Sequence, residues 1–276
     1  MVHQPSWYFQ FPSLRRFAAS LLVLAAFVVN VLRADEQNRP RVVHVFVALA
    51  DNAHQGIVPV PAVLGNGDDP GRNLYWGAAY GVRTFFKKSA EWKELAHLQN
   101  PTPAILERAV FYCASSGVYL IADAYRGSEI KQAIGDFFAA AAGQKKVELL
   151  RVADSGGKAT EIQDAPSLVV YVGHDGLMDF AMEKTFTAAT GGKRQAMVLA
   201  CASKSYFGPS LRATGAQPLL WTTGLMAPEA YTLKAAMDGW MAGESSEEIR
   251  RRAAGAYAKY QRISEKAAMR LLVNGW

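Results

Sequence analysis

The pattern of apolar segments predicts an α/β domain built on a mostly parallel sheet with helices on both faces. Short runs rich in valine, leucine and alanine alternate with longer segments that have a helical apolar period. These runs are nearly continuous in apolar residues, as expected of strands that are covered on both faces. No repeat is apparent, so we expect one domain of residues 35–276. Its expected strands are residues 42–50, 118–122, 168–172, 196–200 and 218–222.

The first expected strand, Val42–Ala50, carries four valines and ends at Asp51-Asn52. The segment that follows, to Tyr75, contains four glycines and three prolines and has no clear period. An irregular segment of this length in a compact domain is usually functional or disordered. Because it leaves the carboxyl end of a strand, we expect it to overhang the edge at which the other parallel strands end.

Helical periods in the remaining segments predict the helices that cover this sheet. Pro103 and Gly117 bracket one helix, and Ser245 with Glu248 forms a capping box at the start of the last. Pro228 lies near the start of the helix before it. The expected helices are residues 78–98, 102–116, 129–142, 228–242 and one that begins after Ser245.

The first 34 residues differ in plan from the rest of the chain. Arg15 and Arg16 precede an apolar run over residues 17–32, and Ala34 is a small residue suited to cleavage. This order is that of a secretory signal peptide. The run is shorter than the ~20 residues of a membrane span, and an uncleaved N-terminal anchor is the alternative. Residues 1–34 therefore predict an exported protein, periplasmic or secreted, whose only link to a membrane is this segment.

The positive charge of the chain is partly a property of that leader. The formal net charge is +6, and residues 1–34 contain three arginines and no acid, which leaves +3 for the rest. The only tight basic run, Arg250–Arg252, lies in an expected helix, where such a run is usually a solvated face. No nucleic-acid-binding motif accompanies it, so nucleic acid is not an expected partner.

Two of the expected strands end on a chemically reactive side chain. His174 follows strand 168–172, and Cys201 follows strand 196–200. Neighbouring parallel strands would bring the imidazole and the thiol together at the edge of the sheet where ligands bind. A thiol becomes a nucleophile as thiolate, and an imidazole that accepts its proton is the usual means of activation. The backbone N–H groups of Cys201 and of a residue near Gly176 are the expected donors to the oxyanion.

Other polar residues are expected at the same edge. Asp51, Asn52 and Asp123 follow strands, where capping and turn roles are the ordinary interpretation. In the functional interpretation, Asn52 orients the imidazole of His174. Asp51, Asp123 or Asp175 then contributes to a substrate-binding pocket.

Cys201 also has structural interpretations, as a small buried hydrophobic residue or as half of a disulfide. The chain has two cysteines, and in an exported protein Cys113 and Cys201 could pair. Cys113 is expected in the helix over residues 102–116, whereas Cys201 is expected at a strand end. Nothing requires their Cα atoms to lie the ~5.5 Å apart that a disulfide needs, so the sequence leaves these interpretations open.

The order of these motifs resembles that of a known family. One strand ends in Gly-His (173–174), and the next ends in Ala-Cys-Ala-Ser (200–203). Leu-Leu-Trp-Thr-Thr (219–223) and an amphipathic helix follow. This arrangement, which spans residues 42–243, is similar to the caspase, legumain and gingipain group of cysteine peptidases and to their CHAT relatives.

The resemblance implies a caspase-like three-layer sandwich and a His-Cys dyad. By resemblance, His174 is the general base, Cys201 is the nucleophile, and the segment after Trp221 forms a wall of the substrate pocket. Asp175 stands where the family usually has glycine directly after the histidine, so that Gly176 follows one position later.

The expected function is that of an exported cysteine endopeptidase, which acts on a peptide or protein through a Cys201 thioacyl intermediate without a cofactor. The lack of an arginine cluster near the edge favours cleavage after Asn or a basic residue over cleavage after Asp. The alternative is a catalytically inactive envelope protein of the same fold, which binds a peptide or protein partner through residues 51–75. A metal-dependent hydrolase built on His174, Asp175 and Asp179 is a weaker interpretation, because the other imidazoles lack the spacing of metal ligands.

Overall fold

The computed structural model describes residues 41–145, 150–153, 159–162, 166–189 and 194–276. These residues belong to one compact unit, Pro40–Trp276. The expected leader, residues 1–34, lies outside the described residues. Across the described ranges, none of the helices combines the length and the apolar character needed to cross a membrane.

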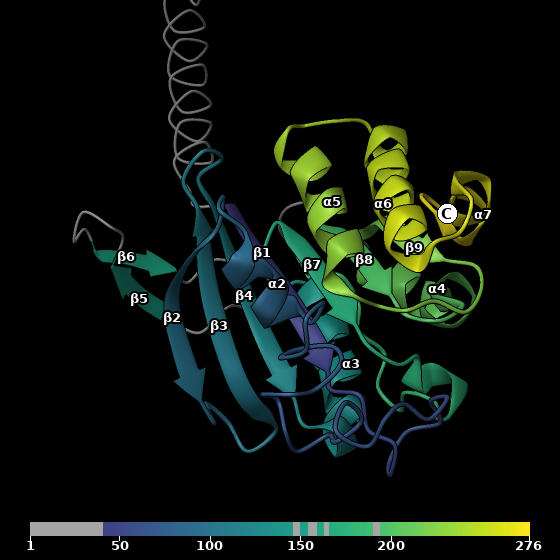
Figure 1. Cartoon of the computed structure of the whole chain (residues 1–276), viewed down its shortest axis with the longest axis horizontal. Coiled ribbons are helices and arrows are strands. Elements are labelled where there is room, and N and C mark those ends of the chain that lie inside the picture. The colour runs from purple at the N-terminus through teal and green to yellow at the C-terminus, as the bar shows by residue number, and fades with distance from the viewer. Residues whose placement is uncertain (1–40, 146–149, 154–158, 163–165, 190–193) are drawn as a thin grey trace, which may run out of the picture. The chain divides into compact units, whose positions relative to one another are not determined.

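A large sheet forms the centre of this unit (Figure 1). In the described part of the chain it has eight strands in the order β10-β9-β8-β7-β1-β4-β3-β2. The pairs β8–β9, β7–β8, β1–β7 and β1–β4 are parallel, and the strands at the two ends of the order are antiparallel to their neighbours. The mostly parallel sheet is therefore confirmed. Its five expected strands are β1 (Arg41–Ala48), β4 (Val118–Tyr125), β7 (Leu168–Val172), β8 (Gln195–Leu199) and β9 (Gln217–Thr222).

Helices cover both faces of the sheet, as expected of an α/β sandwich. Alternate residues of β1 point to opposite faces, so that Val45 and Val47 belong to one apolar cluster and Phe46 and Ala48 to the other. The first cluster includes residues of α2 (Val82–Lys88), α5 (Ala230–Met241), α6 (Ser246–Gln261) and α7 (Glu265–Leu271). The second includes residues of α3 (Ile130–Ala141) and α4 (Ser203–Thr214). The capping box of Ser245 and Glu248 at the start of α6 is confirmed.

Two of the expected helices are wrong. Residues 78–98 divide into the short α2 and the strand β2 (Lys93–Gln99), and residues 102–116 contain the strand β3 (Ile105–Cys113). β3 pairs with both β2 and β4, and Gly117, with φ of 65°, lies in the turn between β3 and β4. Gly117 is therefore a hairpin residue and does not end a helix. The remaining strands are β10 (Leu272–Val273) in the large sheet and the separate hairpin of β5 (Leu150–Ala153) and β6 (Ala159–Ile162).

Candidate functional site

The site lies where β7 and β8 end side by side. These strands run parallel, with Val172 opposite Leu199, and the chain then continues to His174 and Cys201. Gly173 makes the turn at φ of 151°, and a Cβ atom built there would lie 2.9 Å from the carbonyl oxygen of Ala48. Only glycine fits this close approach without strain. The local sequence thus places an imidazole and a thiol at the carboxyl edge of adjacent strands.

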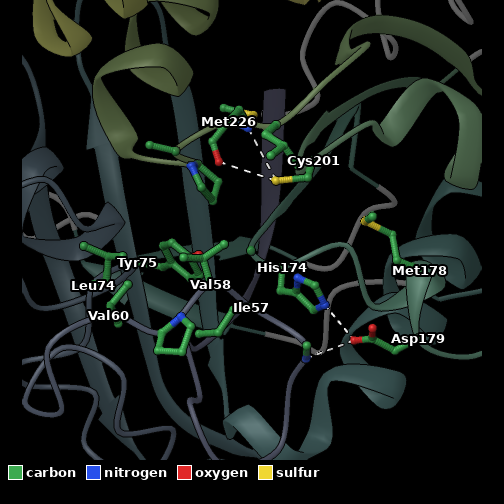
Figure 2. A pocket seen from close by; sticks show the side chains of 16 residues that line it. Ile57, Val58, Val60, Leu74, Tyr75, His174, Met178, Asp179, Cys201 and Met226 are labelled. Carbon is green, nitrogen blue, oxygen red and sulfur yellow. Dashed lines mark hydrogen bonds and ion pairs between the residues drawn. The ribbon is translucent and has the colours of Figure 1, made fainter.

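His174 is held by a carboxylate that comes from the next turn of the chain. Its side chain is 8% exposed, and Nε2 lies 2.7 Å from Oδ2 of Asp179. The same Oδ2 atom accepts the N–H of Gly56 at 3.1 Å, which ties the loop after β1 to the loop after β7. An N–H at Nε2 that donates to Asp179 leaves Nδ1 of the neutral ring as a proton acceptor. Figure 2 shows His174 between Asp179 and Cys201.

The side chain of Cys201 is hydrogen-bonded to the loop after β9. Its sulfur accepts the N–H of Met226 at 3.4 Å and lies 3.6 Å from the carbonyl oxygen of Met226, to which the thiol donates (Figure 2). Burial raises the pKa of Cys201; the hydrogen bond from Met226 offsets part of this effect, and the charge of Asp175 adds to it. Within the described residues, His174 and Cys201 share no hydrogen bond. The resting site is therefore a neutral thiol beside an oriented imidazole.

His174 and Cys201 line one cavity of ≈ 340 Å³. The irregular segment after β1 supplies residues 56–60 and 74–75, the turn after β7 supplies Met178 and Asp179, and the loop after β9 supplies residues 225–228. The expectation that the segment after β1 overhangs this edge is confirmed. The residues that follow Trp221 also form a wall of this cavity.

The segment over residues 51–75 is ordered by polar side chains that bind its backbone. Asn73 is fully buried and its amide makes two hydrogen bonds with the backbone of Ala50, at 3.0 and 2.8 Å. Asn52 does the same with the N–H and carbonyl groups of Val60, at 3.1 and 2.8 Å. Asp51 accepts the N–H of Ala53 and contacts the ring of His54. Asn73 is not a residue that the apolar pattern could single out.

Four of the residues expected at the site lie elsewhere. Asp51 and Asn52 stabilise the loop, and neither belongs to the cavity lining. Trp221 is buried in the core on the α4 side of the sheet. Asp123 lies inside β4, which continues to Tyr125, so its expected place at the strand end is wrong.

Asp123 instead belongs to a buried ionic cluster within the sheet. Its carboxylate accepts hydrogen bonds from Arg108 at 2.5 and 2.8 Å and lies 2.9 Å from Nε2 of His44. Burial alone would raise the pKa of Asp123, but the hydrogen bonds from Arg108 and His44 lower it to about 2. This carboxylate is a structural element of the sheet.

Neither of the two residues after His174 lies as expected, since neither the N–H of Gly176 nor the carboxyl of Asp175 faces the cavity. The N–H of Gly176 donates to the carbonyl oxygen of His174 at 3.1 Å, so it is already engaged. Among the described residues, the N–H groups of Asp175 and Cys201 have no backbone acceptor. The carboxyl of Asp175 is fully buried outside the cavity lining; Oδ1 accepts the N–H of Leu177, and Oδ2 has no partner among the described residues. Burial, with a smaller effect of the Asp179 charge, raises the pKa of Asp175 to about 7.

The two cysteines lie at opposite edges of the sheet and are both free. Cys113 is paired with Val118 at the start of β4, and Val118 is paired with Arg41 at the start of β1. Cys201 follows the end of β8. A strand advances about 3.3 Å per residue, so the length of a strand separates the two thiols and excludes a disulfide.

The described residues contain no group of three or more His, Cys, Asp and Glu side chains arranged to hold a metal ion. Comparison of the chain with protein-family models, with curated proteins and with solved structures finds no match. The geometry of the cavity therefore carries the functional interpretation.

Proposed function

We propose that this chain is an exported cysteine hydrolase of caspase-like fold, and specifically an endopeptidase, in which His174 and Cys201 form a dyad. One observation carries the proposal: the two residues follow neighbouring parallel strands and line the same cavity at the carboxyl edge of the sheet. The bond from Nε2 of His174 to Asp179 supports it, because it leaves Nδ1 to accept a proton.

In the proposed reaction, Nδ1 of His174 accepts the thiol proton and the thiolate of Cys201 attacks the carbonyl carbon of the scissile amide. The N–H groups of Cys201 and Asp175 donate to the oxyanion. The oxyanion then collapses, the C–N bond breaks, and His174 returns the proton to the leaving amine. Water, deprotonated by the same imidazole, hydrolyses the thioester and restores the thiol.

A second function, the binding of a peptide or protein without catalysis, is favoured by the state of the thiol. Burial and the nearby Asp175 raise the pKa of Cys201, whereas an activated cysteine has a lowered pKa. In this case the cavity would hold its ligand without a covalent step. The two functions differ in whether His174 changes the reactivity of Cys201.

The experiment that separates them is the pH dependence of Cys201 alkylation by iodoacetamide. It uses the chain with Cys113→Ser, which leaves Cys201 as its only thiol. If the chain is an endopeptidase, alkylation should be rapid below pH 7, and His174→Ala should abolish this rapid reaction. The control His97→Ala, on the distant edge strand β2, should leave the rate unchanged. Alkylation that follows an ordinary thiol with pKa ~8.5 in all three variants would favour the binding protein.

A further inference from the structure

The walls of the cavity are apolar on the side away from Asp179. Ile57, Val60 and Leu74 line it from the segment after β1, and Met226 and Pro228 line it from the loop after β9. Tyr75 adds an aromatic ring that is 7% exposed. These residues come from two loops far apart in the sequence, so the apolar lining is a feature of the assembled edge.

The apolar side of the cavity offers no counter-charge to a charged side chain. Among the described residues, the cavity lining contains no lysine or arginine, and its one carboxylate is that of Asp179, whose side chain is 40% exposed. Oδ2 of Asp179 already contacts His174 and accepts the N–H of Gly56. In Figure 2, Asp179 lies on one side of His174, and Ile57, Val58 and Leu74 lie on the other. A charge buried against that apolar wall would be unpaired, which is strongly unfavourable.

Two exposed apolar side chains extend the lining to the mouth of the cavity. Val58 is 81% exposed and Leu225 is 72% exposed, the largest fractions of any large hydrophobic residue in the described part of the chain. A single exposed apolar side chain is ordinary. Both of these, however, line this cavity, one from each of its two loops. A ligand that enters the cavity would bury both side chains.

We propose that the cavity receives a large apolar side chain, such as that of leucine, methionine or phenylalanine, at the residue before the scissile bond. This inference rests on the proposed peptidase function and assigns its substrate class. A cavity of ≈ 340 Å³ is near the lower limit of about 300–1,000 Å³ for ligand sites, which suits a short stretch of peptide. The apolar lining favours this substrate class over cleavage after Asn or a basic residue. That earlier expectation was made without knowing which loop residues line the cavity.

The test uses thiol-directed peptidyl acyloxymethyl ketones that differ only in the last residue, which is Leu, Phe, Asp, Asn or Arg. The full chain with Cys113→Ser is labelled at Cys201, and the second-order rate is read by intact mass. We expect the Leu and Phe probes to react at least tenfold faster than the other three. Equal or faster labelling by the Asp, Asn or Arg probe would overturn the proposal.

Variants at the mouth test the role of the two loops. Val58→Asp and Leu225→Asp should each slow the Leu probe at least fivefold relative to the iodoacetamide rate of the same variant, which corrects for any change in the thiol itself. Ile263→Asp is the matched control, since Ile263 is 41% exposed and lies outside the cavity. An unchanged ratio at both positions would refute the role of the loops.

The failure of this inference differs from that of the proposed function. If iodoacetamide labelling depends on His174 but the apolar probes have no advantage, the substrate assignment falls and the dyad stands. If the iodoacetamide rate does not depend on His174, the dyad falls and the substrate assignment falls with it.

Discussion

The buried carboxyl of Asp175 should make the stability of the protein fall as the pH rises. Its pKa is about 7 in the folded protein, against an ordinary value of 3.8. Between these values the folded state binds one more proton than the unfolded state, so the stabilisation is complete below pH 3.8 and is lost as the pH approaches 7. Asp175→Asn removes this titration and keeps an acceptor for the N–H of Leu177.

The size of the effect follows from the shift. One group can change the free energy of unfolding by at most ~1.4 kcal/mol per pH unit, so the shift from 3.8 to about 7 sets an upper limit of about 4 kcal/mol. The free energy of unfolding of the wild type, minus that of Asp175→Asn, should therefore fall by about 2–4 kcal/mol from pH 4 to pH 8.

Urea unfolding at one-unit pH intervals measures this difference, in which the other titrating groups largely cancel. Tyr171, Cys201 and Asp179 interact electrostatically with Asp175, and the raised pKa values of Tyr171 and Cys201 keep these two groups protonated over this range. The control Asp68→Asn makes the same substitution at a carboxyl whose side chain is 59% exposed, and it should not reproduce the fall. A flat difference for Asp175→Asn, or one that rises with pH, would refute a buried neutral carboxyl.

Two further substitutions test the geometry around His174. Asp179→Ala removes the group that orients the imidazole, and it should slow alkylation of Cys201 about 10–100-fold. The control Glu183→Ala changes an exposed ion pair with Lys131 and should have no effect. Equal alkylation rates in the two variants would contradict the role of Asp179. Gly173→Ala places a Cβ atom 2.9 Å from a carbonyl oxygen at φ of 151°, and should lower the free energy of unfolding by about 1–3 kcal/mol. Gly255→Ala, in α6 with open space around it, should raise it by up to about 1 kcal/mol; chemical denaturation compares the two, and a harmless Gly173→Ala would show that the turn is not strained.

The parallel strands could be predicted because burial on both faces leaves a direct trace in the sequence. β7 reads Leu-Val-Val-Tyr-Val with every residue buried, and such a run has few alternatives. β2 is different, since it is an edge strand that reads Lys-Glu-Leu-Ala-His-Leu-Gln with no fully buried residue. Charged residues protect an edge strand from further pairing, and the same residues are good helix formers. Its partner β3 is buried at every residue but Tyr112, but Glu107 and Arg108 interrupt its apolar run.

The site was predictable to the extent that chain direction determines it. His174 and Cys201 follow parallel strands, so both lie at the same edge of the sheet regardless of the loop conformations. The partner of His174 could not be found in this way. Asp179 reaches the imidazole through the 3-10 turn Gly176–Met178, and Asn73 returns to Ala50 across the whole loop. Both contacts depend on the geometry of turns, which cannot be predicted from the periodicity of apolar residues.

The backbone gives a last reason to assign function to this edge. The described residues include three non-glycine positions with positive φ, which are Asn100, Ala202 and Arg262. Asn100 lies in the turn after β2, where asparagine tolerates this conformation, and Arg262 ends α6 as a left-handed cap. Neither explanation applies to Ala202. This alanine directly follows Cys201 and precedes α4 with φ of 45°.

The strain at Ala202 has counterparts beside His174. Gly173, directly before it, needs a backbone conformation that other residues rarely adopt, and Asp175, directly after it, buries a carboxyl oxygen without a partner among the described residues. Each of these features costs stability, and packing alone would not retain all three around one cavity. All three lie next to His174 or Cys201, which supports the proposed nucleophilic role of these two residues.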